Sequence, residues 1–264
     1  MTREIRRDGE RADTDVNKKP EIRSYPSLPE LSRAAAEFIC DLAEARIKEK
    51  NIFTLVLSGG STPRLLYEEL SGQAISKRMD WQKTHIFWGD ERYLPPDHPD
   101  SNYRLAFQTL VSKVDIPPAN LHQILTESRS ANGAAEAYEK ALRNFFRPSA
   151  GSEDLAYLPS FDLVLLGLGE DGHTASLFRG DAALEEKYRW VVAVDGASAS
   201  PPVPRITLTL PVLNKADCVI FLVSGSRKKV IFEEIMNHPR TAAYPAARVR
   251  PSGRLLWFID EWLV

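Results

Sequence analysis

The sequence contains few cysteines and no long apolar run, and each shortage excludes a class of protein. Cys40 and Cys218 are the two cysteines of the 264-residue chain, and both have apolar neighbours, which predicts core thiols rather than a disulfide or a metal pair. No apolar stretch approaches the roughly 18 residues that a membrane span requires. The first residues also lack the apolar segment of a secretory signal peptide. We therefore expect a cytoplasmic protein without a membrane partner.

The chain carries no excess of positive charge. Its 34 Lys and Arg residues are offset by 36 Asp and Glu residues, which gives a formal net charge of −2 at pH 7. Broad binding of nucleic acid requires a basic face, so no nucleic-acid partner is expected, although a local anion site is not excluded. Apolar residues make up 43% of the chain and charged residues 27%, an ordinary balance for a globular protein with a substantial core.

The N-terminal segment, residues 1–23, is crowded with charges of both signs and has few apolar residues. Such a segment cannot bury enough surface to offset its chain entropy, which predicts a disordered tail. Its acidic residues argue against a transit peptide. The rest of the chain, 24–264, is expected to form a single α/β domain, because the two irregular loops within it, 147–160 and 194–204, are too short to be clear linkers.

From residue 28 onward, the apolar pattern alternates between strand and helix. Strands are predicted at Phe53–Leu57, Thr84–Trp88, Phe161–Leu168, Trp190–Val194, Asp217–Val223 and Leu255–Ile259. Helices are predicted at Leu28–Lys50, Pro63–Leu70, Asn102–Leu110, Gly133–Phe146 and Ser226–Met236. This alternation predicts a mostly parallel, Rossmann-like sheet with helices on both faces. Ligands of such sheets bind beyond the carboxyl ends of the strands, so the loops after the strands are the places to look for a site.

The loop after the first predicted strand is rich in glycine and hydroxyl groups. Its residues are Ser58, Gly59, Gly60, Ser61 and Thr62. Pro63 follows and suits the first turn of a helix, where free N–H groups attract anions. No Gly-Lys-Ser/Thr sequence follows, so a phosphate monoester fits this loop better than a nucleoside triphosphate. A plain tight turn capped by Thr62 explains the same residues equally well.

The strand predicted at Phe161–Leu168 leads into a G-x-G-x-x-G pattern that ends at Gly172. This pattern is typical of dinucleotide binding, and Asp195 lies about 20 residues further on, as that motif requires. The motif also requires a long helix after the third glycine. The sequence Arg179-Gly180-Asp181 would end such a helix early, which argues against a nicotinamide cofactor.

His173 directly follows the last glycine of this pattern. A histidine there has no part in holding a pyrophosphate, but its ordinary pKa of about 6.5 suits proton transfer near neutral pH. Asp171 is close enough in sequence to orient the imidazole. A lone histidine is more often structural than catalytic, so both interpretations stay open at this point.

Two further strand ends carry charged residues. Asp90 and Arg92 follow the strand predicted at Thr84–Trp88, where Arg92 could hold a phosphate through paired N–H donors and Asp90 could orient or activate a substrate group. A solvated charged turn is the alternative.

Arg205 precedes a β-like run, and three cations, Arg227, Lys228 and Lys229, lie where a helix start disfavours positive charge. These cations indicate either a nearby anion or plain exposure to solvent. Taken together, the glycine turns, the arginine–aspartate set, the histidine and the lysine cluster predict a site for a small phosphorylated molecule.

These segments make the sequence similar to a known family. The matching stretches are LSGGSTPRLLYEEL, FWGDERYLPPDHPDSNYRLA, FDLVLLGLGEDGHTASLF, PRITLTLPVLNKA and FLVSGSRKK. In this order, and from about Tyr25 to the C-terminus, the chain resembles the 6-phosphogluconolactonases, hydrolases of the oxidative pentose phosphate pathway. The resemblance implies an α/β fold shared with the glucosamine-6-phosphate deaminases, and no metal, nucleotide or other cofactor.

The resemblance also implies hydrolysis of a phosphosugar lactone, 6-phospho-D-glucono-1,5-lactone. It implies His173 as the general base. From the residues themselves, we expect Asp171 and Asp90 to be further catalytic residues. The residues implied for the phosphosugar pocket are Ser58, Gly59, Gly60, Ser61, Thr62, Arg92, Arg205 and Lys228. The sequence does not decide between a monomer and a homodimer.

The deaminases are the nearest alternative. They resemble this chain around the histidine but carry a glutamate five residues after it, where this chain has Phe178. Ring opening and isomerisation need extra acid–base groups, so the missing carboxylate favours a lactone hydrolase. A non-catalytic phosphosugar sensor is the other alternative. It is disfavoured because no helix-turn-helix pattern lies ahead of the predicted sheet.

Overall fold

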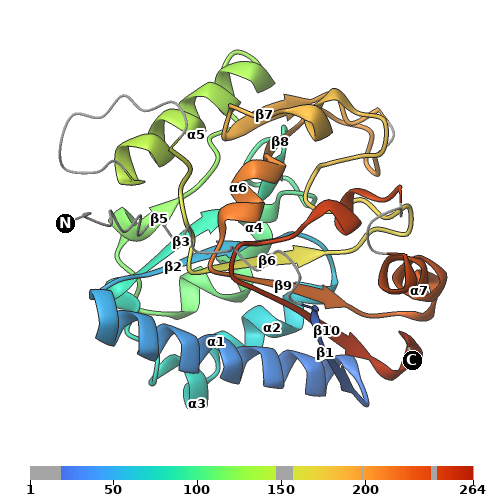
Figure 1. Ribbon diagram of the computed structural model, residues 1–264. Helices are drawn as coiled ribbons and strands as arrows, with labels where there is room; N and C mark the ends of the chain where they lie inside the picture. Colours follow the sequence, from blue (N-terminus) through green and yellow to red (C-terminus); the bar gives the residue numbers. More distant parts are fainter. Residues whose placement is uncertain (1–18, 147–156, 198, 239–242, 264) are drawn as a thin grey trace, which may run out of the picture.

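The computed structural model describes residues 19–146, 157–197, 199–238 and 243–263. These residues form a seven-stranded sheet in which every pair of neighbouring strands is parallel (Figure 1). Its strands, in spatial order, are β1 (Glu21–Tyr25), β10 (Arg254–Asp260), β9 (Cys218–Val223), β6 (Leu163–Gly167), β2 (Phe53–Leu57), β3 (Thr84–Trp88) and β5 (Leu121–His122). The predicted α/β fold with a mostly parallel sheet is confirmed.

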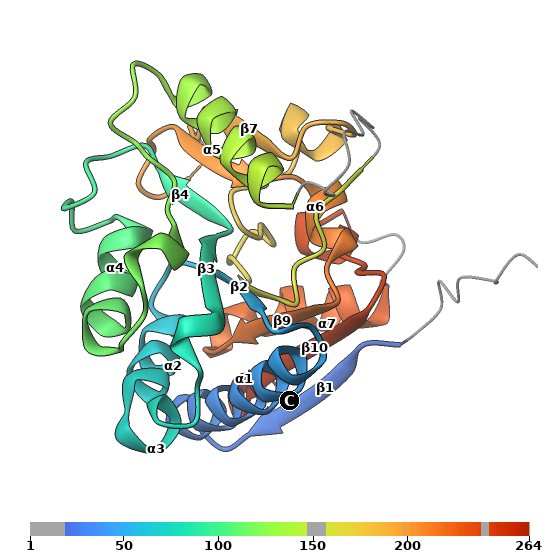
Figure 2. The ribbon, with the colours of Figure 1, turned by 90° about the vertical axis from the view of Figure 1, so that its left-hand side faces the viewer.

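Helices cover both faces of this sheet. Figures 1 and 2 show α1 (Leu28–Lys50) and α2 (Thr62–Ser71) against one face and α5 (Ala131–Phe146) on the opposite side. The other helices are α3 (Gln73–Ser76), α4 (Asn102–Thr109), α6 (Leu210–Lys215) and α7 (Lys229–Asn237). Because both faces are covered, all residues of β2 and β9 are buried. Among the described residues, no helix combines the length and apolar character needed to cross a membrane.

The N-terminal boundary of the folded part differs from the predicted one. Residues 1–18 of the predicted tail lie outside the described residues, but its last residues belong to β1, which begins at Glu21 and pairs in parallel with β10. The carboxylate of Glu21 accepts two hydrogen bonds of 2.9 Å from Arg254 of β10. Pairing with a neighbouring strand therefore orders a segment whose apolar content alone predicts no strand.

A second, antiparallel sheet has the strand order β4-β8-β7. Its strands are β4 (Asp90–Arg92), β8 (Arg205–Leu208) and β7 (Val191–Val194). The expectation that the strand at Trp190–Val194 joins the main parallel sheet is wrong, because β7 pairs only with β8. The short β7–β8 connection contains no crossover helix, so it suits an antiparallel pair. Figure 1 shows this sheet beside α5, above the main sheet.

The chain changes direction across the main sheet between β2 and β6. From β2 the chain continues outward to β3 and β5, whereas from β6 it continues to β9 and β10 on the other side. β2 and β6 are direct neighbours, so the loops that follow them lie side by side at the carboxyl edge. Such a switch point is where open α/β sheets bind ligands. The glycine-rich turn after β2 and the histidine loop after β6 both occupy it.

Two histidines at the far edge of the sheet lead to a prediction about acid stability. Nδ1 of His85 on β3 and Nε2 of His122 on β5 are 3.0 Å apart, and the His122 ring stacks on Phe87. Burial lowers the pKa of both imidazoles, and for His122 the positive charge of His85 adds to the effect and brings the pKa to about 4. The fold therefore favours the neutral rings. Their contribution to stability is present above the unfolded pKa of about 6.5 and is lost as the pH falls toward 4.

We expect the melting temperature of the protein to fall between pH 6.5 and pH 4, and we expect His122→Phe to flatten that fall. Phe keeps the stacking on Phe87 but does not take up a proton. His238→Gln is the matched control, because His238 is exposed and its removal should leave the pH dependence as it is. The measurement is thermal unfolding at half-unit pH steps. An identical slope for His122→Phe and the unmodified protein would contradict this account.

Candidate active site

A cavity of about 730 Å³ opens at the carboxyl edge of the main sheet, on the switch point between β2 and β6. The loops after β2, β6 and β9 line it, together with β4 and the first residue of β8. Every residue predicted for the site lines this cavity except Asp171, which supports His173 from behind. Sequence segments more than a hundred residues apart therefore meet in one place.

The turn after β2 is shaped by its two glycines. A Cβ atom on Gly59 would lie 1.8 Å from Oδ1 of Asn102, the first residue of α4, so only glycine permits this close approach. Gly60 has φ +98°, a conformation that favours glycine. The phenol of Tyr67 accepts a hydrogen bond from the Ser58 N–H (3.0 Å) and donates one to the Ser58 carbonyl (2.5 Å). This holds the turn in place beside the start of α2, whose first residues, Thr62 and Pro63, line the cavity.

The loop after β6 folds back on itself and presents His173 to the cavity. The N–H of Gly169 donates to the His173 carbonyl (2.9 Å), and a Cβ atom on Gly169 would lie 2.1 Å from Nδ1 of the imidazole. Gly172 has φ +79°. Among the residues described after β6, the next helical element is the short turn η4 (Ala182–Glu185), so the long helix of a dinucleotide motif is missing here. The glycines of this loop therefore serve to present the histidine.

Asp171 binds the imidazole on one side. Its Oδ1 is 2.5 Å from Nδ1 of His173 and also accepts the His173 backbone N–H at 3.1 Å. The hydrogen bond from His173 lowers the pKa of Asp171, which favours a charged carboxylate that accepts a hydrogen bond from the Nδ1–H group. With Nδ1 engaged in this way, Nε2 is the ring nitrogen that remains for a ligand. The pair can act on a proton of a ligand in the cavity.

Phe178 connects the histidine to an arginine. Its ring centroid is 4.8 Å from that of His173, and Cζ of Arg205 lies 5.7 Å from the Phe178 ring. The side chain is buried. In the sequence Phe178 marks only a missing carboxylate, whereas in the structure it packs between two cavity residues. The only sign of this packing in the sequence was an apolar residue at the position five residues after the histidine.

Arg92 and Arg205 are opposite each other on β4 and β8, and the nearby carboxylates of Asp90 and Glu91 offset only part of the cost of burying Arg205. Arg205 is 3% exposed, and its Nη2 donates to the carbonyls of Ser200 and Pro201 at 3.0 and 3.1 Å. The Nε atoms of both arginines are buried without a hydrogen-bond partner, and within the described residues neither arginine forms an ion pair. Burial, followed by repulsion from Arg92, lowers the pKa of Arg205. An anion between these guanidinium groups would relieve both costs.

The two carboxylates before Arg92 have different surroundings. Oδ2 of Asp90, which lines the cavity, accepts a hydrogen bond of 2.6 Å from Ser176. Glu91, which the sequence analysis did not select, is 2% exposed and accepts from the backbone N–H groups of Arg92, Asn102 and Tyr103 at 2.7–2.8 Å. Burial raises the pKa of Glu91. Glu91 therefore fixes the start of α4 and the position of Arg92.

Of the three cations after β9, Lys228 is the one that the structure places in the cavity with its side chain half-buried. Arg227 borders the cavity, but its side chain is 82% exposed and is paired with Glu170 at 3.0 Å. Lys229 is 3.9 Å from Glu233 and does not line the cavity. Burial lowers the pKa of Lys228. The predicted helix start is also corrected: Ser226–Lys228 is a 3-10 turn (η5), and α7 begins at Lys229.

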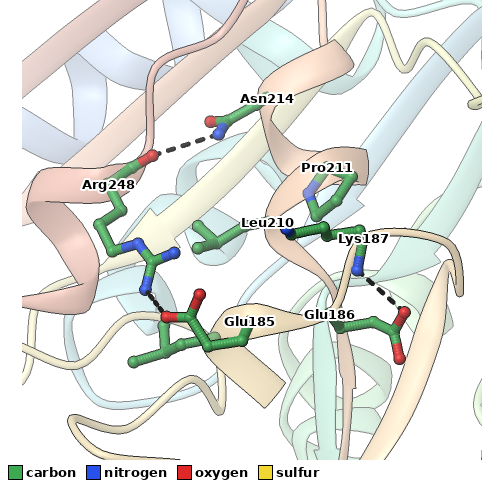
Figure 3. A pocket seen from close by; sticks show the side chains of 8 residues that line it. Glu185, Glu186, Lys187, Leu210, Pro211, Asn214 and Arg248 are labelled. Carbon is green, nitrogen blue, oxygen red and sulfur yellow. Dashed lines mark hydrogen bonds and ion pairs between the residues drawn. The ribbon is translucent and has the colours of Figure 1, made fainter. Parts of the chain in front are cut away.

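A second cavity of about 280 Å³ contains none of the predicted site residues (Figure 3). Some of its charged and polar groups are paired with one another. Nη1 of Arg248 is 2.7 Å from Glu185, and the Asn214 amide donates to the Arg248 carbonyl at 3.2 Å. Within the described residues, no group of three or more His, Cys, Asp or Glu side chains is arranged to hold a metal ion. The larger cavity is therefore the candidate active site.

The fold and this cavity define an α/β protein with a glycine-lined cavity that contains cationic side chains, and with a histidine–aspartate pair, at the switch point of a parallel sheet. The chain belongs to the glucosamine-6-phosphate isomerase/6-phosphogluconolactonase family, whose model matches residues 26–257. A 6-phosphogluconolactonase of Synechocystis sp. is 43% identical over 216 residues, which are 81% of this chain and 85% of that protein. A 6-phosphogluconolactonase of Nostoc sp. is 38% identical and covers 92% of this chain and 96% of its own length.

Solved structures agree with this assignment. The 6-phosphogluconolactonase of Trypanosoma cruzi superposes with a TM-score of 0.82 at 32% identity and covers 93% of this chain and 96% of its own. The enzyme of Thermotoga maritima gives a TM-score of 0.78 at 33% identity, with 92% and 100% covered. A monomeric glucosamine-6-phosphate deaminase shares the fold, with a TM-score of 0.74 at 19% identity.

Proposed function

We propose that this chain is a 6-phosphogluconolactonase, which hydrolyses 6-phospho-D-glucono-1,5-lactone to 6-phospho-D-gluconate in the oxidative pentose phosphate pathway. One observation carries the proposal: the His173–Asp171 pair and a cationic, glycine-lined pocket share a cavity of about 730 Å³. That volume accommodates a phosphorylated hexose. The names of the relatives, and the level of identity to them, support the same activity.

The phosphate end of the substrate is the anchor. The dianion binds at the turn from Gly60 to Pro63, where the N–H groups of the α2 start are available, and Arg92, Arg205 and Lys228 add positive charge around the cavity. Fixing this end holds the lactone carbonyl near His173. Positioning alone removes much of the entropic cost of bringing water, base and carbonyl together.

His173 then acts as the general base. Nε2 takes a proton from a water molecule while the water oxygen attacks C1 of the lactone. The C1–ring oxygen bond breaks, and the protonated imidazole returns its proton to that oxygen, so that water is added and nothing else is consumed. Asp171 accepts a hydrogen bond from the Nδ1–H group throughout, without taking up the proton, and stabilises the imidazolium that forms. A positioned general base contributes roughly 10²–10⁴-fold, which is adequate for an ester that already hydrolyses unaided.

The direct test generates the lactone in place from glucose 6-phosphate and its dehydrogenase and follows its decay with and without this protein. After spontaneous hydrolysis is subtracted, we expect a decay rate that rises in proportion to protein concentration. No acceleration would contradict the proposal. Release of ammonium from glucosamine 6-phosphate would indicate a deaminase instead. Binding of either phosphosugar without turnover of any would indicate a sensor.

A further inference from the structure

Asp260, the last residue of β10, is a buried carboxylate that the proposed reaction does not use. Its side chain is 2% exposed and does not line the cavity. It accepts a hydrogen bond from Oγ of Ser224 at 2.5 Å and one from the N–H of Gly225 at 3.2 Å. β10 is the parallel neighbour of β9 (Figure 1). Because Ile259 pairs with Val223, Asp260 lies beside the turn that follows β9. The carboxylate therefore ties that turn to the end of the adjacent strand.

The turn held in this way carries Lys228 into the cavity. Gly225 has φ +100°, and a Cβ atom added to it would contact nothing within 4 Å, so packing does not restrain the turn at this point. The N–H of Lys228 donates to the Gly225 carbonyl at 3.2 Å. Residues 224–228 all line the cavity. The hydrogen bonds to Asp260 are thus a principal restraint on the segment between β9 and the lysine.

Asp260 also contributes charge. The ammonium group of Lys228 is half-buried, which lowers its pKa, and the nearby Arg227 acts in the same direction. The carboxylates of Glu170 and Asp260 oppose this effect and favour the charged ammonium. Of these two carboxylates, Glu170 is exposed and paired with Arg227, whereas Asp260 is buried and bonded to the turn itself. The same residue therefore orients the lysine and favours its charge.

We propose that Asp260 is a positioning residue for anion binding: through Ser224 and Gly225 it holds the turn so that Lys228 faces the phosphate end of the substrate. This inference rests on the proposed lactonase function for its substrate. A turn that is already ordered loses little freedom when the ligand binds, whereas an untethered one must be ordered at the expense of affinity. Asp260 should accordingly act on binding of the phosphate and not on the chemical step.

The test is Asp260→Asn, which keeps the side-chain shape and removes the charge. We expect KM for the phosphorylated lactone to rise roughly tenfold, the scale of a lost charge-assisted hydrogen bond, with kcat within about twofold of the unmodified enzyme. Glucono-1,5-lactone without the phosphate should be hydrolysed by both proteins with the same kcat/KM. Ser224→Ala, which keeps the carboxylate, should raise KM in the same direction but less. Glu261→Gln is the matched control, since Glu261 is the exposed neighbour of Asp260.

Two outcomes would overturn the inference. An unchanged KM for the phosphorylated lactone in Asp260→Asn would show that the tether is not needed. An equal loss on both lactones would show a general effect on the fold. Calorimetric titration with inorganic phosphate is the second measurement, and Kd should rise about tenfold in Asp260→Asn. If neither lactone is hydrolysed by the unmodified protein, the proposed function fails, and the phosphate titration alone still confirms or overturns the role of Asp260.

Discussion

Replacing His173 with asparagine should lower kcat for the phosphorylated lactone by about 10²–10⁴-fold and leave KM nearly unchanged. The imidazole lines the cavity and is oriented by a carboxylate, with Nδ1 2.5 Å from Asp171. An asparagine amide can still donate to Asp171, so the loop between Gly169 and His173 keeps its shape while the base is lost. The phosphate anchor lies on other segments of the chain and does not depend on this side chain. Steady-state kinetics, corrected for spontaneous hydrolysis, measure the effect.

The control for this experiment is His238→Asn, which makes the same exchange at an exposed position outside the cavity and should keep full activity. Direct binding of 6-phosphogluconate to His173→Asn, measured by calorimetry, should be close to that of the unmodified protein. Turnover that survives the substitution would remove His173 from the mechanism. A loss of binding equal to the loss of kcat would instead indicate that the loop itself had moved.

The main sheet was predictable because its strands are buried on both faces. Short, largely apolar runs mark β2 (FTLVL) and β3 (THIFW), and the structure begins and ends both strands at the predicted residues. The helix at Leu28–Lys50 was equally clear, since Leu31, Ala35, Ile39 and Ala43 recur at helical spacing and are buried. A left-handed residue at Asn51 ends it. In these elements the apolar pattern of the local sequence matches the residues that the fold buries, so the sequence alone predicts them.

The strands that escaped prediction owe their structure to partners far away in the sequence. β4 consists of Asp90, Glu91 and Arg92, which have little β-propensity, and it exists because it pairs with β8. β1 likewise depends on β10. No window of local sequence contains the partner strand, so no periodicity could reveal the pairing. The strand at Trp190–Val194 was predicted, but its place outside the main sheet was not, for the same reason.

The candidate site was predictable in outline because parallel strands end at one edge. That rule alone brings the turn at Gly60 and the loop at His173 together. It cannot bring in Arg205, which begins a strand and reaches the cavity through the antiparallel pairing of β8 with β4. It also gives no sign of Glu91 or Asp260, whose buried carboxylates bond to backbone N–H groups of the segments that carry Arg92 and Lys228. Such supporting contacts depend on three-dimensional packing.

Arg205→Met should raise KM for the phosphorylated lactone roughly 10- to 150-fold, the range that a loss of about 1.5–3 kcal/mol from hydrogen bonds to a charged group gives. Arg205 is 3% exposed, faces Arg92 across two strands, and has a buried Nε without a partner. These features leave the guanidinium poorly compensated until an anion arrives. The flexible, apolar methionine side chain occupies similar space without a charge. Because the chemical step depends on His173, kcat should change much less than KM.

The same substitution should cost the folded protein little stability, and this distinguishes a binding residue from a structural one. Removing this buried charge relieves its desolvation and its repulsion with Arg92. That gain offsets the loss of the attraction to Asp90 and of the bonds to the backbone carbonyls of residues 200 and 201. We expect a melting temperature within about 3 °C of the unmodified protein, or above it. Arg189→Met, which removes a surface arginine outside the cavity, should leave both KM and stability unchanged. A large drop in melting temperature with a normal KM would mean that Arg205 serves the fold and that the anion binds elsewhere.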